Sequence, residues 1–577
     1  MSLSLGELKE RGEAPEFLTP EAFQMLHGGY LQKDETPKDA YRRVAKTISS
    51  ELGKPELENI FFDLIWKNWL CPASPCLSNL GTRNLPISCF SAKSMDDLFD
   101  IMKHVQELVM LSKYGGGVGS SFSDLRQRGA PVSRGGTSGG IVPFLKMVEA
   151  AVDGTTQGSS RRGSVASYLD FSHGDVDEFI DVRRPTGDIS RRCLTKSFHN
   201  AISITDEEMN EIKSTNGKYR ERWNRIMLAR FETGEPYLMF KGNANKNCPD
   251  GYVGRIHQSN LCSEIMAPVT STETFVCCLS SLNLAKYNEW KKWKDTETGK
   301  TLVELSIMFL DGVLTAFIKQ AKCLAGMENA VRFAENHRML GLGALGWHSL
   351  LQQEGIAFDS FEAMKLNAEI FSKMRKEADK ATLDLGKEYG ECKETFGTGR
   401  RNTATLAIAP TMSNSVLSGG VSQGIEPITA NLFVQKGAKG SFLKKNAALT
   451  SLLISLGKDT PEVWDQINRD KGSVKNLNFL SEEQKLVFAT ARELNQHSLV
   501  KQAAQRQKWI DQGQSLNLFF SLPQTKEDAV KVSRYVNEVH IAAWESGVKS
   551  LYYMKTESPI KGEAVFRTTD ECEACSG

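Results

Sequence analysis

The stretch QSNLCSEI, residues 258–265, decides how the rest of the chain is interpreted. It places Asn260, Cys262 and Glu264 at alternate positions, and alternate side chains of a β-strand point to the same face. An extended segment here would therefore present an amide, a thiol and a carboxylate together. The alternative is a buried structural cysteine between two polar loop residues, because free cysteine is often part of a protein core.

Two other segments carry cysteines that could join this thiol in one site. Cys89 lies far upstream in ISCFS, and FVCCLSSLNL, residues 275–284, contains Cys277 and Cys278. Two cysteines that form a disulfide need Cα atoms about 4.4–6.8 Å apart. The sequence does not show that proximity, and each cysteine remains open to the alternative of a packed core thiol.

A fourth segment with cysteines, ECEACSG, lies at the C-terminal end, and in it Cys572 and Cys575 form a C-x-x-C pair. Such a pair is typical of a redox dithiol or of half a zinc site. Zinc would need two more ligands, and the nearest upstream candidates, His497 and His540, sit in no ligand-like motif. A dithiol at the end of a segment without periodicity suits shuttling, so we predict a redox role and no metal site.

Taken together, these segments resemble the large subunits of class I ribonucleotide reductases, over roughly residues 35–577. The resemblance implies that NLCSE carries a thiyl radical on Cys262. It also implies that Asn260 orients the substrate and that Glu264 acts as general base on its 3′ hydroxyl.

The same resemblance assigns the remaining cysteines of the site. Cys89 and Cys277 would supply two electrons and become a disulfide, and we choose Cys277 over Cys278 because it keeps the family's six-residue step to the asparagine of SSLNL. Cys572 and Cys575 would then re-reduce that disulfide by thiol–disulfide exchange. Thioredoxin or glutaredoxin would restore the tail.

Tyr552 and Tyr553, in KSLYYM, resemble the paired tyrosines of this family. They imply a partner, a small radical-generating beta subunit that holds the radical cofactor, from which the tyrosines relay the oxidation to Cys262. No cofactor would be bound covalently in this chain. Two aromatic residues on a strand are the ordinary alternative for such a pair.

Two segments resemble the family's substrate site. The stretch APTMSNSVLSGGVSQGIEP, residues 409–427, resembles the loop and helix start that hold the substrate diphosphate, and hydroxyl and backbone N–H groups suit phosphate without net basic charge. KYGGGVGSSFSDLRQRG, residues 113–129, resembles the glycine-rich stretch under the substrate, although alone it indicates only a tight turn. The substrate-binding residues implied are Ser74, Gly117, Thr411, Met412, Ser413, Asn414 and Ser415.

A regulatory site is also implied. TTQGSSRRGS, residues 155–164, resembles the loop that links substrate choice to effector choice, with Gln157 and Arg161 near the base, and its alternative is a flexible basic loop. Asp96 and Arg126 would contact the effector, a dNTP or ATP bound with magnesium. A homodimer is expected, with effector-dependent assembly as an option.

The pattern of apolar residues indicates a mixed α/β chain. Residues 1–70 have helical spacing, with Pro37 at a helix start, and residues 71–90 contain residues that favour turns. Helix-like and strand-like runs then alternate, as expected for an α/β architecture. The examples are helix-like residues 141–154 and strand-like residues 199–205, 401–409 and 548–554.

The resemblance, rather than this periodicity, implies the architecture. It predicts a ten-stranded α/β barrel with Cys262 on a loop inside it and a helical domain at the N-terminus. We expect a helical region over 1–70, a catalytic barrel with the specificity site over 71–556, and a flexible redox tail over 557–577.

Composition narrows the classes of partner. The chain has 577 residues, with 71 basic and 70 acidic side chains, so no global field favours nucleic acid or an anionic membrane. The N-terminus has no apolar signal region, and no run approaches the ~18 apolar residues of a membrane span. We expect a cytoplasmic protein, in the host's cytoplasm if a phage encodes it, with its 12 cysteines reduced unless they are catalytic.

The N-terminus predicts a regulatory property. The family-like segment ETPKDAYRRVAK begins at Glu35, and the 34 residues before it are too few for the ATP-binding helical domain that many relatives carry. We therefore predict that overall activity control by dATP is absent and that control of substrate specificity is present.

Two other functions are weighed against this one. An adenosylcobalamin-dependent reductase of the same superfamily would share NLCSE and the tail dithiol but would need neither paired tyrosines nor a partner. A non-enzymatic nucleotide-binding or zinc-binding protein would not explain the complete set of cysteines. Diphosphate or triphosphate substrate, and the metal of the partner subunit, are left open by the sequence.

Overall fold

The structure is a computed structural model that describes residues 3–133, 135–155, 163–214, 218–437 and 440–556. The chain begins with helices, as predicted. Thr36 caps the third of them in a capping box with Asp39, and Pro37 occupies its first turn, which explains why the helix starts there. These helices are α1 (Leu5–Glu10), α2 (Pro20–His27), α3 (Pro37–Glu51), η1 (Pro55–Leu57) and α4 (Glu58–Trp66).

A seven-stranded sheet forms the first half of the barrel region, in the order β13-β6-β5-β4-β3-β2-β7. Its five central strands are parallel neighbours, whereas β7 and β13 pair antiparallel at the two edges. The strands are β2 (Cys89–Lys93), β3 (Gly117–Ser121), β4 (Ser164–Asp170), β5 (Phe198–Ile204), β6 (Tyr237–Phe240), β7 (Phe275–Val276) and β13 (Ser550–Leu551).

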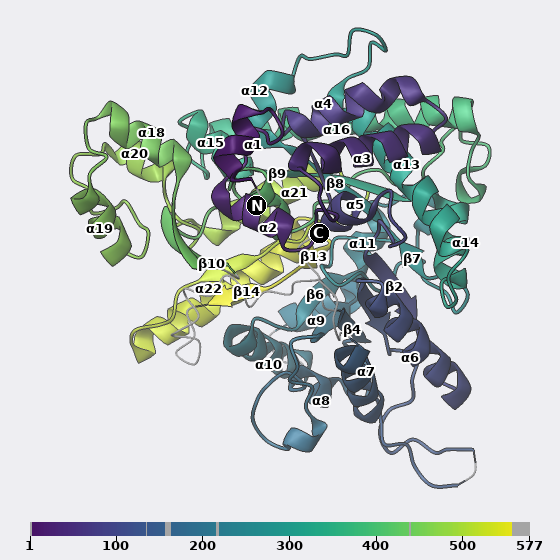
Figure 1. The fold of residues 1–577 in the computed structure, drawn as a ribbon. Helices are drawn as coiled ribbons and strands as arrows, with labels where there is room; N and C mark the ends of the chain where they lie inside the picture. Colours follow the sequence, from purple (N-terminus) through teal and green to yellow (C-terminus); the bar gives the residue numbers. More distant parts are fainter. Residues whose placement is uncertain (1–2, 134, 156–162, 215–217, 438–439, 557–577) are drawn as a thin grey trace.

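Helices connect these parallel strands, as parallel pairing requires. Figure 1 shows them together in the lower part of the molecule. They are α6 (Leu98–Lys113), α7 (Val142–Thr155), α8 (Val176–Ile180), η2 (Ile189–Arg191), α9 (Asp206–Lys213) and α10 (Lys218–Thr233). Two short helices, α11 (Lys241–Lys246) and η3 (Asp250–Tyr252), follow β6.

A second, three-stranded sheet has the order β1-β8-β9, with β8 and β9 parallel. Single parallel bridges extend it from Leu342 to Leu406 and from Ile408 to Gln514. The strands are β1 (Leu70–Pro72), β8 (Cys278–Asn283) and β9 (Leu340–Leu345). The two sheets contribute the strands of the predicted α/β barrel, and their side chains belong to one continuous apolar core with the N-terminal helices.

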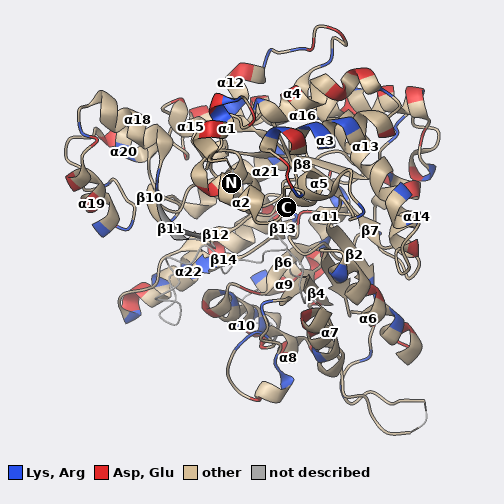
Figure 2. Cartoon of the chain, in the orientation of Figure 1, with Lys and Arg blue, Asp and Glu red and all other residues tan. Residues whose placement is uncertain are grey.

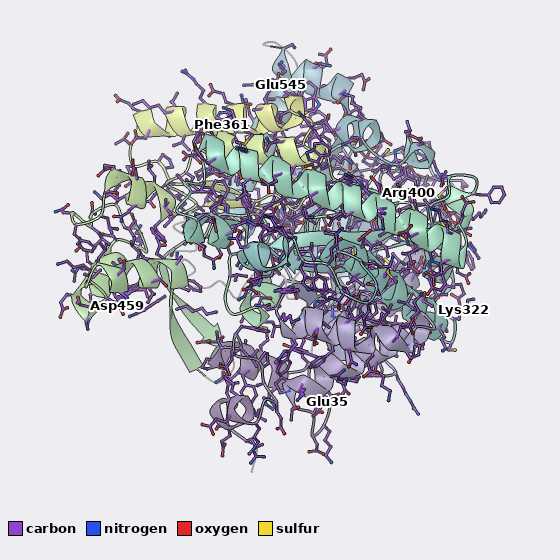
Figure 3. The ribbon with its side chains drawn as sticks, turned by 90° about the horizontal axis from the view of Figure 1, so that it is seen from above. Glu35, Lys322, Phe361, Arg400, Asp459 and Glu545 are labelled. Carbon is purple, nitrogen blue, oxygen red and sulfur yellow. The ribbon has the colours of Figure 1, made fainter. Side chains whose placement is uncertain are left out.

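Long helices cover the second sheet. Helix α13 packs on α3 and α16, and α16 runs across this side of the molecule from Phe361 (Figure 3). The helices of this half of the chain, apart from those of the small subdomain described next, are η4 (Leu284–Lys286), α12 (Tyr287–Trp290), α13 (Leu302–Ala321), α14 (Glu328–His337), α15 (Trp347–Gln353), α16 (Phe361–Tyr389), η5 (Lys393–Thr395), α17 (Met412–Leu417), α21 (Gln496–Gln507) and α22 (Lys526–Glu545).

A small subdomain beside the barrel has its own apolar core, which contains Leu449, Trp464 and Ile467. Figure 1 shows its helices at the left edge of the molecule. Its elements are β10 (Leu432–Gly437), β11 (Gly440–Lys445), α18 (Ala447–Ser455), α19 (Pro461–Arg469) and α20 (Glu482–Val487). The parallel pair β12 (Leu518–Phe520) and β14 (Met554–Thr556) follows.

Three local predictions need correction. Residues 71–90 contain a short helix, α5 (Ser74–Asn79), with Pro75 in its first turn, as well as turns. Residues 401–409 form only single bridges rather than a strand. Residues 548–554 split into β13 and the start of β14, and between them the N–H of Tyr553 donates to the Asn517 side chain instead of to a strand carbonyl.

Charged side chains lie mainly on the outer helices, and the central strands are largely uncharged (Figure 2). Within the described part of the chain, no helix is both long enough and apolar enough to cross a bilayer.

Candidate active site

Residues 258–265 form a loop, which corrects the strand that the spacing predicted and agrees with the loop that the resemblance implied. Ser263 has a φ of 64°, in the left-handed region, so the segment cannot stay extended. The Asn260 side chain accepts the N–H of Ile265 at 3.2 Å and closes the loop on itself. Asn260 and Glu264 meet through this fold, not through strand alternation.

Glycines of β3 make room for this loop. A Cβ atom on Gly119 would lie 1.9 Å from the Ser259 carbonyl oxygen, and one on Gly117 would lie 2.6 Å from the Leu261 side chain. Any larger residue would therefore push the loop off the sheet. This contact gives a physical reason for the glycine-rich stretch, which alone had indicated only a tight turn.

The segment 512–515 packs against the opposite side of the loop. Gly513 donates its N–H to the Glu264 carbonyl at 2.7 Å. Ser515 donates its hydroxyl to the Cys262 carbonyl at 2.6 Å, and the same oxygen lies 3.1 Å from the Glu264 carboxylate. The loop is thus held between β3 of the first sheet and a segment bridged to the second.

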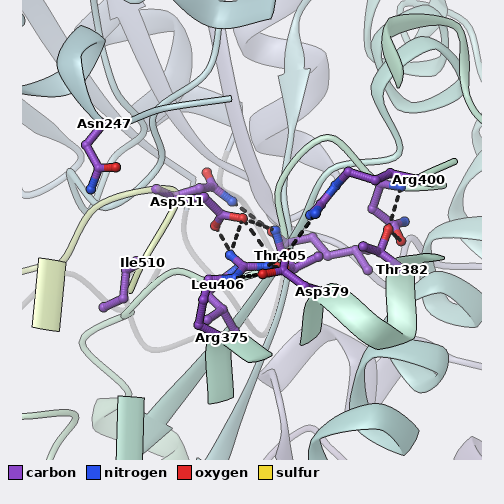
Figure 4. A network of polar contacts seen from close by, with 12 residues as sticks. Asn247, Arg375, Asp379, Thr382, Arg400, Thr405, Leu406, Ile510 and Asp511 are labelled. Atoms are coloured by element: carbon purple, nitrogen blue, oxygen red, sulfur yellow. Dashed lines mark hydrogen bonds and ion pairs between the residues drawn. The ribbon is translucent and has the colours of Figure 1, made fainter. Parts of the chain in front are cut away.

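A polar network anchors that segment (Figure 4). Asp511 accepts the backbone N–H groups of Thr405 and Leu406, each at 2.9 Å, and pairs with Arg375 of α16 at 2.8 Å. Arg375 also pairs with Asp379. Because all these groups are fixed by two or more partners, the residues after Asp511 have little freedom to move away from the loop.

Asn260 links the carboxylate to a thiol. Its amide lies 3.0 Å from the Glu264 carboxylate and 3.2 Å from Cys89 Sγ. Glu264 is only 1% exposed, and burial raises the pKa of its carboxyl to about 7, against the hydrogen bonds from Asn260 and Ser515 that lower it. This carboxyl therefore changes protonation near neutral pH, which suits a general base.

Cys89 and Cys277 face each other across two strands. The register of β2 and β7 pairs Phe90 with Val276, so the next pair outward is Cys89 with Cys277, and the Cys277 N–H donates to the Cys89 carbonyl at 3.1 Å. Directly opposed residues have Cα atoms about 4.5–5.5 Å apart, within the range of disulfides. The structure thus brings together the pair that sequence could not place.

Cys278 lies on the other side of its strand. Its Sγ contacts the Leu310 carbonyl of α13 at 3.5 Å, away from the loop.

Burial raises the pKa of Cys89 and Cys277 well above that of a free thiol, so both are S–H groups at neutral pH. None of the ten described cysteines forms a disulfide, and a cavity is lined by Cys89, Cys262 and Glu264.

The paired tyrosines belong to a cluster of three. The rings of Tyr552 and Tyr553 are 4.3 Å apart, and Tyr237 of β6 lies 4.7 Å and 4.9 Å from them. Ser550, two residues before Tyr552, donates to the carbonyl of Ser263 at 2.6 Å. The segment that carries the tyrosines is therefore bonded directly to the loop that carries Cys262.

Comparisons with known proteins now bear on this geometry. The barrel domain of ribonucleotide reductase matches residues 87–220, 207–398 and 393–554, and the all-alpha domain of the same enzyme matches residues 16–84. The chain belongs to the ribonucleotide reductase large-subunit family. It is therefore an oxidoreductase, and its family resemblance begins at residue 16, upstream of the predicted start at Glu35.

Individual relatives agree with this assignment. A Frog virus 3 protein, provisionally named as the large subunit of ribonucleoside-diphosphate reductase, is 39% identical over 91% of this chain and 93% of its own. The large subunit of Invertebrate iridescent virus 3 is 32% identical over 96% and 97%. The class Id ribonucleotide reductase alpha subunit of Actinobacillus ureae is similar in structure, with a TM-score of 0.84, 37% identity and coverage of 96% and 99%. These likenesses favour class I over a cobalamin-dependent reductase.

Residues 409–427, the segment expected to bind the substrate diphosphate, are held in place by hydrogen bonds. Thr411, at a φ of 56°, accepts the Gly424 N–H at 2.7 Å, and Asn414 donates to the Pro72 carbonyl at 3.1 Å. The Ser415 hydroxyl donates within α17, to the carbonyl of Met412 at 2.8 Å. These bonds hold the segment beside the chain that leads into α5.

At the start of α5, Ser74 shares a 2.9 Å hydrogen bond with Tyr30. The N-terminal residues that precede α3 thus reach the expected phosphate site. Ser413 lies in α17 between Met412 and Asn414, and its side chain is partly exposed.

The expected effector residues are adjacent. Arg126 pairs with Asp96 at 2.8 Å and donates its backbone N–H to the same carboxylate at 3.2 Å. Gln157 and Arg161 lie outside the described residues, as do Cys572 and Cys575 of the tail.

Sequence analysis missed several residues of this reductase site. Gln512 donates to the Leu340 carbonyl at 2.8 Å with its amide 3.7 Å from Cys277 Sγ, and the Tyr168 hydroxyl donates to the Asn260 carbonyl at 2.7 Å. Tyr237 was also missed. These residues come from distant segments without a motif, so only the fold assembles them.

Proposed function

We propose that Cys262 carries the thiyl radical and that Cys89 and Cys277 are the substrate-reducing dithiol. The observation that carries this proposal is the opposition of Cys89 and Cys277 across β2 and β7, beside the cavity that Cys262 lines. Their raised pKa values support it as well, because hydrogen-atom chemistry needs neutral S–H groups.

In the proposed reaction, every atom and electron is accounted for. The Cys262 thiyl takes the 3′ hydrogen of the ribonucleotide and returns it at the end. The C2′–O bond breaks, the hydroxyl leaves as water, and a hydrogen replaces it at C2′. The two thiols of Cys89 and Cys277 supply the two electrons and two protons, and become a disulfide.

Glu264 and Asn260 are assigned the acid–base and positioning roles. The Glu264 carboxylate would take the proton of the 3′ hydroxyl, which a carboxyl with a pKa of about 7 does near neutral pH. Asn260 would hold that carboxylate and the Cys89 thiol next to each other, since its amide contacts both.

The partners are also proposals. Tyr552 and Tyr553 would relay the oxidation from a radical-generating beta subunit, which holds the radical cofactor. Cys572 and Cys575 would re-reduce the Cys89–Cys277 disulfide, with thioredoxin or glutaredoxin as the final donor. Thiols in this free state suit the reducing cytoplasm, the host's where a virus encodes the chain.

Binding roles complete the proposal. The segments at Ser74 and residues 411–415 would hold the diphosphate, with Gly117 under the sugar. Asp96, Arg126 and residues 155–164 would bind a dNTP or ATP effector with magnesium, in a homodimer.

The test is CDP reduction with excess beta subunit and a dNTP effector, comparing wild type with Cys262→Ser. A serine hydroxyl holds its hydrogen too strongly to act as the relay, so we expect turnover to be lost while nucleotide binding persists. Substantial dCDP formation by Cys262→Ser would overturn the assignment of this residue.

A further inference from the structure

A histidine and a glutamate lie directly beside the tyrosine cluster. His199 of β5 and Glu235, at the turn between α10 and β6, are each 5% exposed, and His199 Nδ1 is 2.7 Å from Glu235 Oε1. The Tyr553 hydroxyl oxygen is 3.4 Å from the same Nδ1, and the two rings meet edge to face at 6.2 Å. The imidazole nitrogen thus lies between a phenol and a carboxylate.

The surroundings keep Glu235 ionised. Its second oxygen accepts the Asn200 N–H at 3.2 Å and lies 3.4 Å from Arg183 Nε. Burial opposes ionisation, but His199, Arg183 and these hydrogen bonds together hold the pKa of Glu235 below its usual value. The carboxylate is therefore ionised and bonded to the imidazole, so it is free to take up the proton that the two groups share.

A tyrosine that loses one electron must also lose its phenolic proton, because the oxidised phenol is a very strong acid. Proton transfer needs an acceptor within hydrogen-bond reach, and such contacts are often long in a resting structure and shorten in the working complex. Tyr553 is the half-buried outer member of the proposed relay, whereas Tyr552 is only 2% exposed. The acceptor therefore stands at the tyrosine that an external oxidant reaches first.

We propose that the His199–Glu235 pair takes the phenolic proton of Tyr553 when Tyr553 is oxidised and returns it when Tyr553 is reduced. The proton shared by Nδ1 and Glu235 shifts onto the carboxylate, and the Nδ1 lone pair accepts the proton of the O–H bond that breaks. The pair gains one proton. Tyr553 becomes a neutral phenoxyl radical, and its electron passes to the oxidant of the radical-generating subunit.

This proposal rests on the proposed role of Tyr553 as a relay. The other charged and titratable groups around the pair are spread over the elements that pack there. Arg230 bonds the Tyr552 carbonyl at 3.0 Å and lies 3.3 Å from His540. The set consists of Arg183, Arg230, Tyr237, His540 and Tyr552.

The first test is CDP reduction by His199→Ala with excess beta subunit, with and without added imidazoles of different pKa. We expect kcat to fall by about 10²-fold, the usual contribution of a positioned base, at an unchanged KM for CDP. Added imidazoles should restore turnover, and the restored rate should rise with their pKa. Turnover within twofold of wild type, or restoration that does not depend on the pKa of the base, would overturn the proposal.

The second variant keeps the side-chain volume. Glu235→Gln leaves a hydrogen-bonding group beside His199 but cannot take its proton, so we expect a loss of kcat of about tenfold or more with KM unchanged. Glu232→Gln, three residues earlier at an exposed pair with Arg184, is the matched control and should keep wild-type turnover. Equal turnover in Glu235→Gln and Glu232→Gln would contradict the proposal.

Tyr553→Phe separates this inference from the function on which it rests. If Tyr553→Phe keeps turnover, the relay itself is wrong. If Tyr553→Phe is inactive while His199→Ala and Glu235→Gln turn over like wild type, the relay stands and only the proton acceptor is refuted.

Discussion

The thiol pocket and the tyrosine cluster lie close together but are built on opposite electrostatic principles. In the pocket, burial raises the pKa values of Cys89, Cys277 and Glu264, which keeps the two thiols neutral and lets the carboxyl titrate near neutral pH. In the cluster, His199 lies beside the Tyr553 hydroxyl and is bonded in turn to the ionised Glu235. Hydrogen-atom transfer needs an intact S–H, whereas phenol oxidation can separate the proton from the electron and then needs a nearby proton acceptor. This difference is what we expect if the pocket and the cluster carry out these two proposed tasks.

The strongest way to break this comparison is to remove one thiol of the pocket. Cys89→Ser or Cys277→Ser leaves no dithiol to oxidise, so we expect multiple-turnover CDP reduction to fall by about 10³-fold or more, at least ~4 kcal/mol in activation free energy. The matched control is Cys278→Ala, next in sequence but facing α13, which should keep turnover within about threefold. An inactive Cys278→Ala beside an active Cys277→Ser would exchange the two assignments.

The cluster is tested by deleting phenol hydroxyls. Tyr552→Phe and Tyr553→Phe keep the ring volume but remove the oxidisable O–H, so each should reduce turnover by about 10²-fold or more without a loss of thermal stability. Tyr535→Phe is the control, because that hydroxyl bonds Asn495 and the Gln496 N–H and Tyr535 is not part of the cluster. Wild-type turnover in both cluster variants would reopen the cobalamin-dependent alternative.

The pH profile tests the carboxyl of the pocket. Glu264 must be ionised to act as a base, and its pKa is raised to about 7, so kcat should decline as the pH falls below about 7. Glu264→Gln should lose about 10²-fold in kcat, and its residual rate should lack this acid limb. An identical acid limb in Glu264→Gln would show that another group titrates.

Much of the site could be predicted from the sequence, because its chemistry is local. NLCSE keeps a thiol, an amide and a carboxylate within five residues. The sequence therefore places these groups together even though the segment forms a loop and not the predicted strand. The helix at Pro37 was predictable for the same reason, since its capping box is contained in four residues.

The rest depends on contacts between distant segments. Gln512 and Tyr168 reach the loop through the barrel, and their sequence neighbourhoods carry no signal of this. The choice of Cys277 over Cys278 rested on a spacing, whereas the register of β2 and β7 supplies the physical reason. The His199–Glu235 pair joins β5 to the turn before β6 and likewise has no local motif.

The central claim is that Cys89 and Cys277 are oxidised together when a ribonucleotide is reduced. A single-turnover reaction of the Cys572→Ser/Cys575→Ser variant with beta subunit, CDP and effector, without external reductant, isolates that event. After trapping free thiols and digesting the protein, mass spectrometry should find the Cys89 and Cys277 peptides joined by a disulfide, one for each dCDP formed. Formation of dCDP with Cys89 and Cys277 still recovered as free thiols, or with the disulfide at Cys278, would contradict the account.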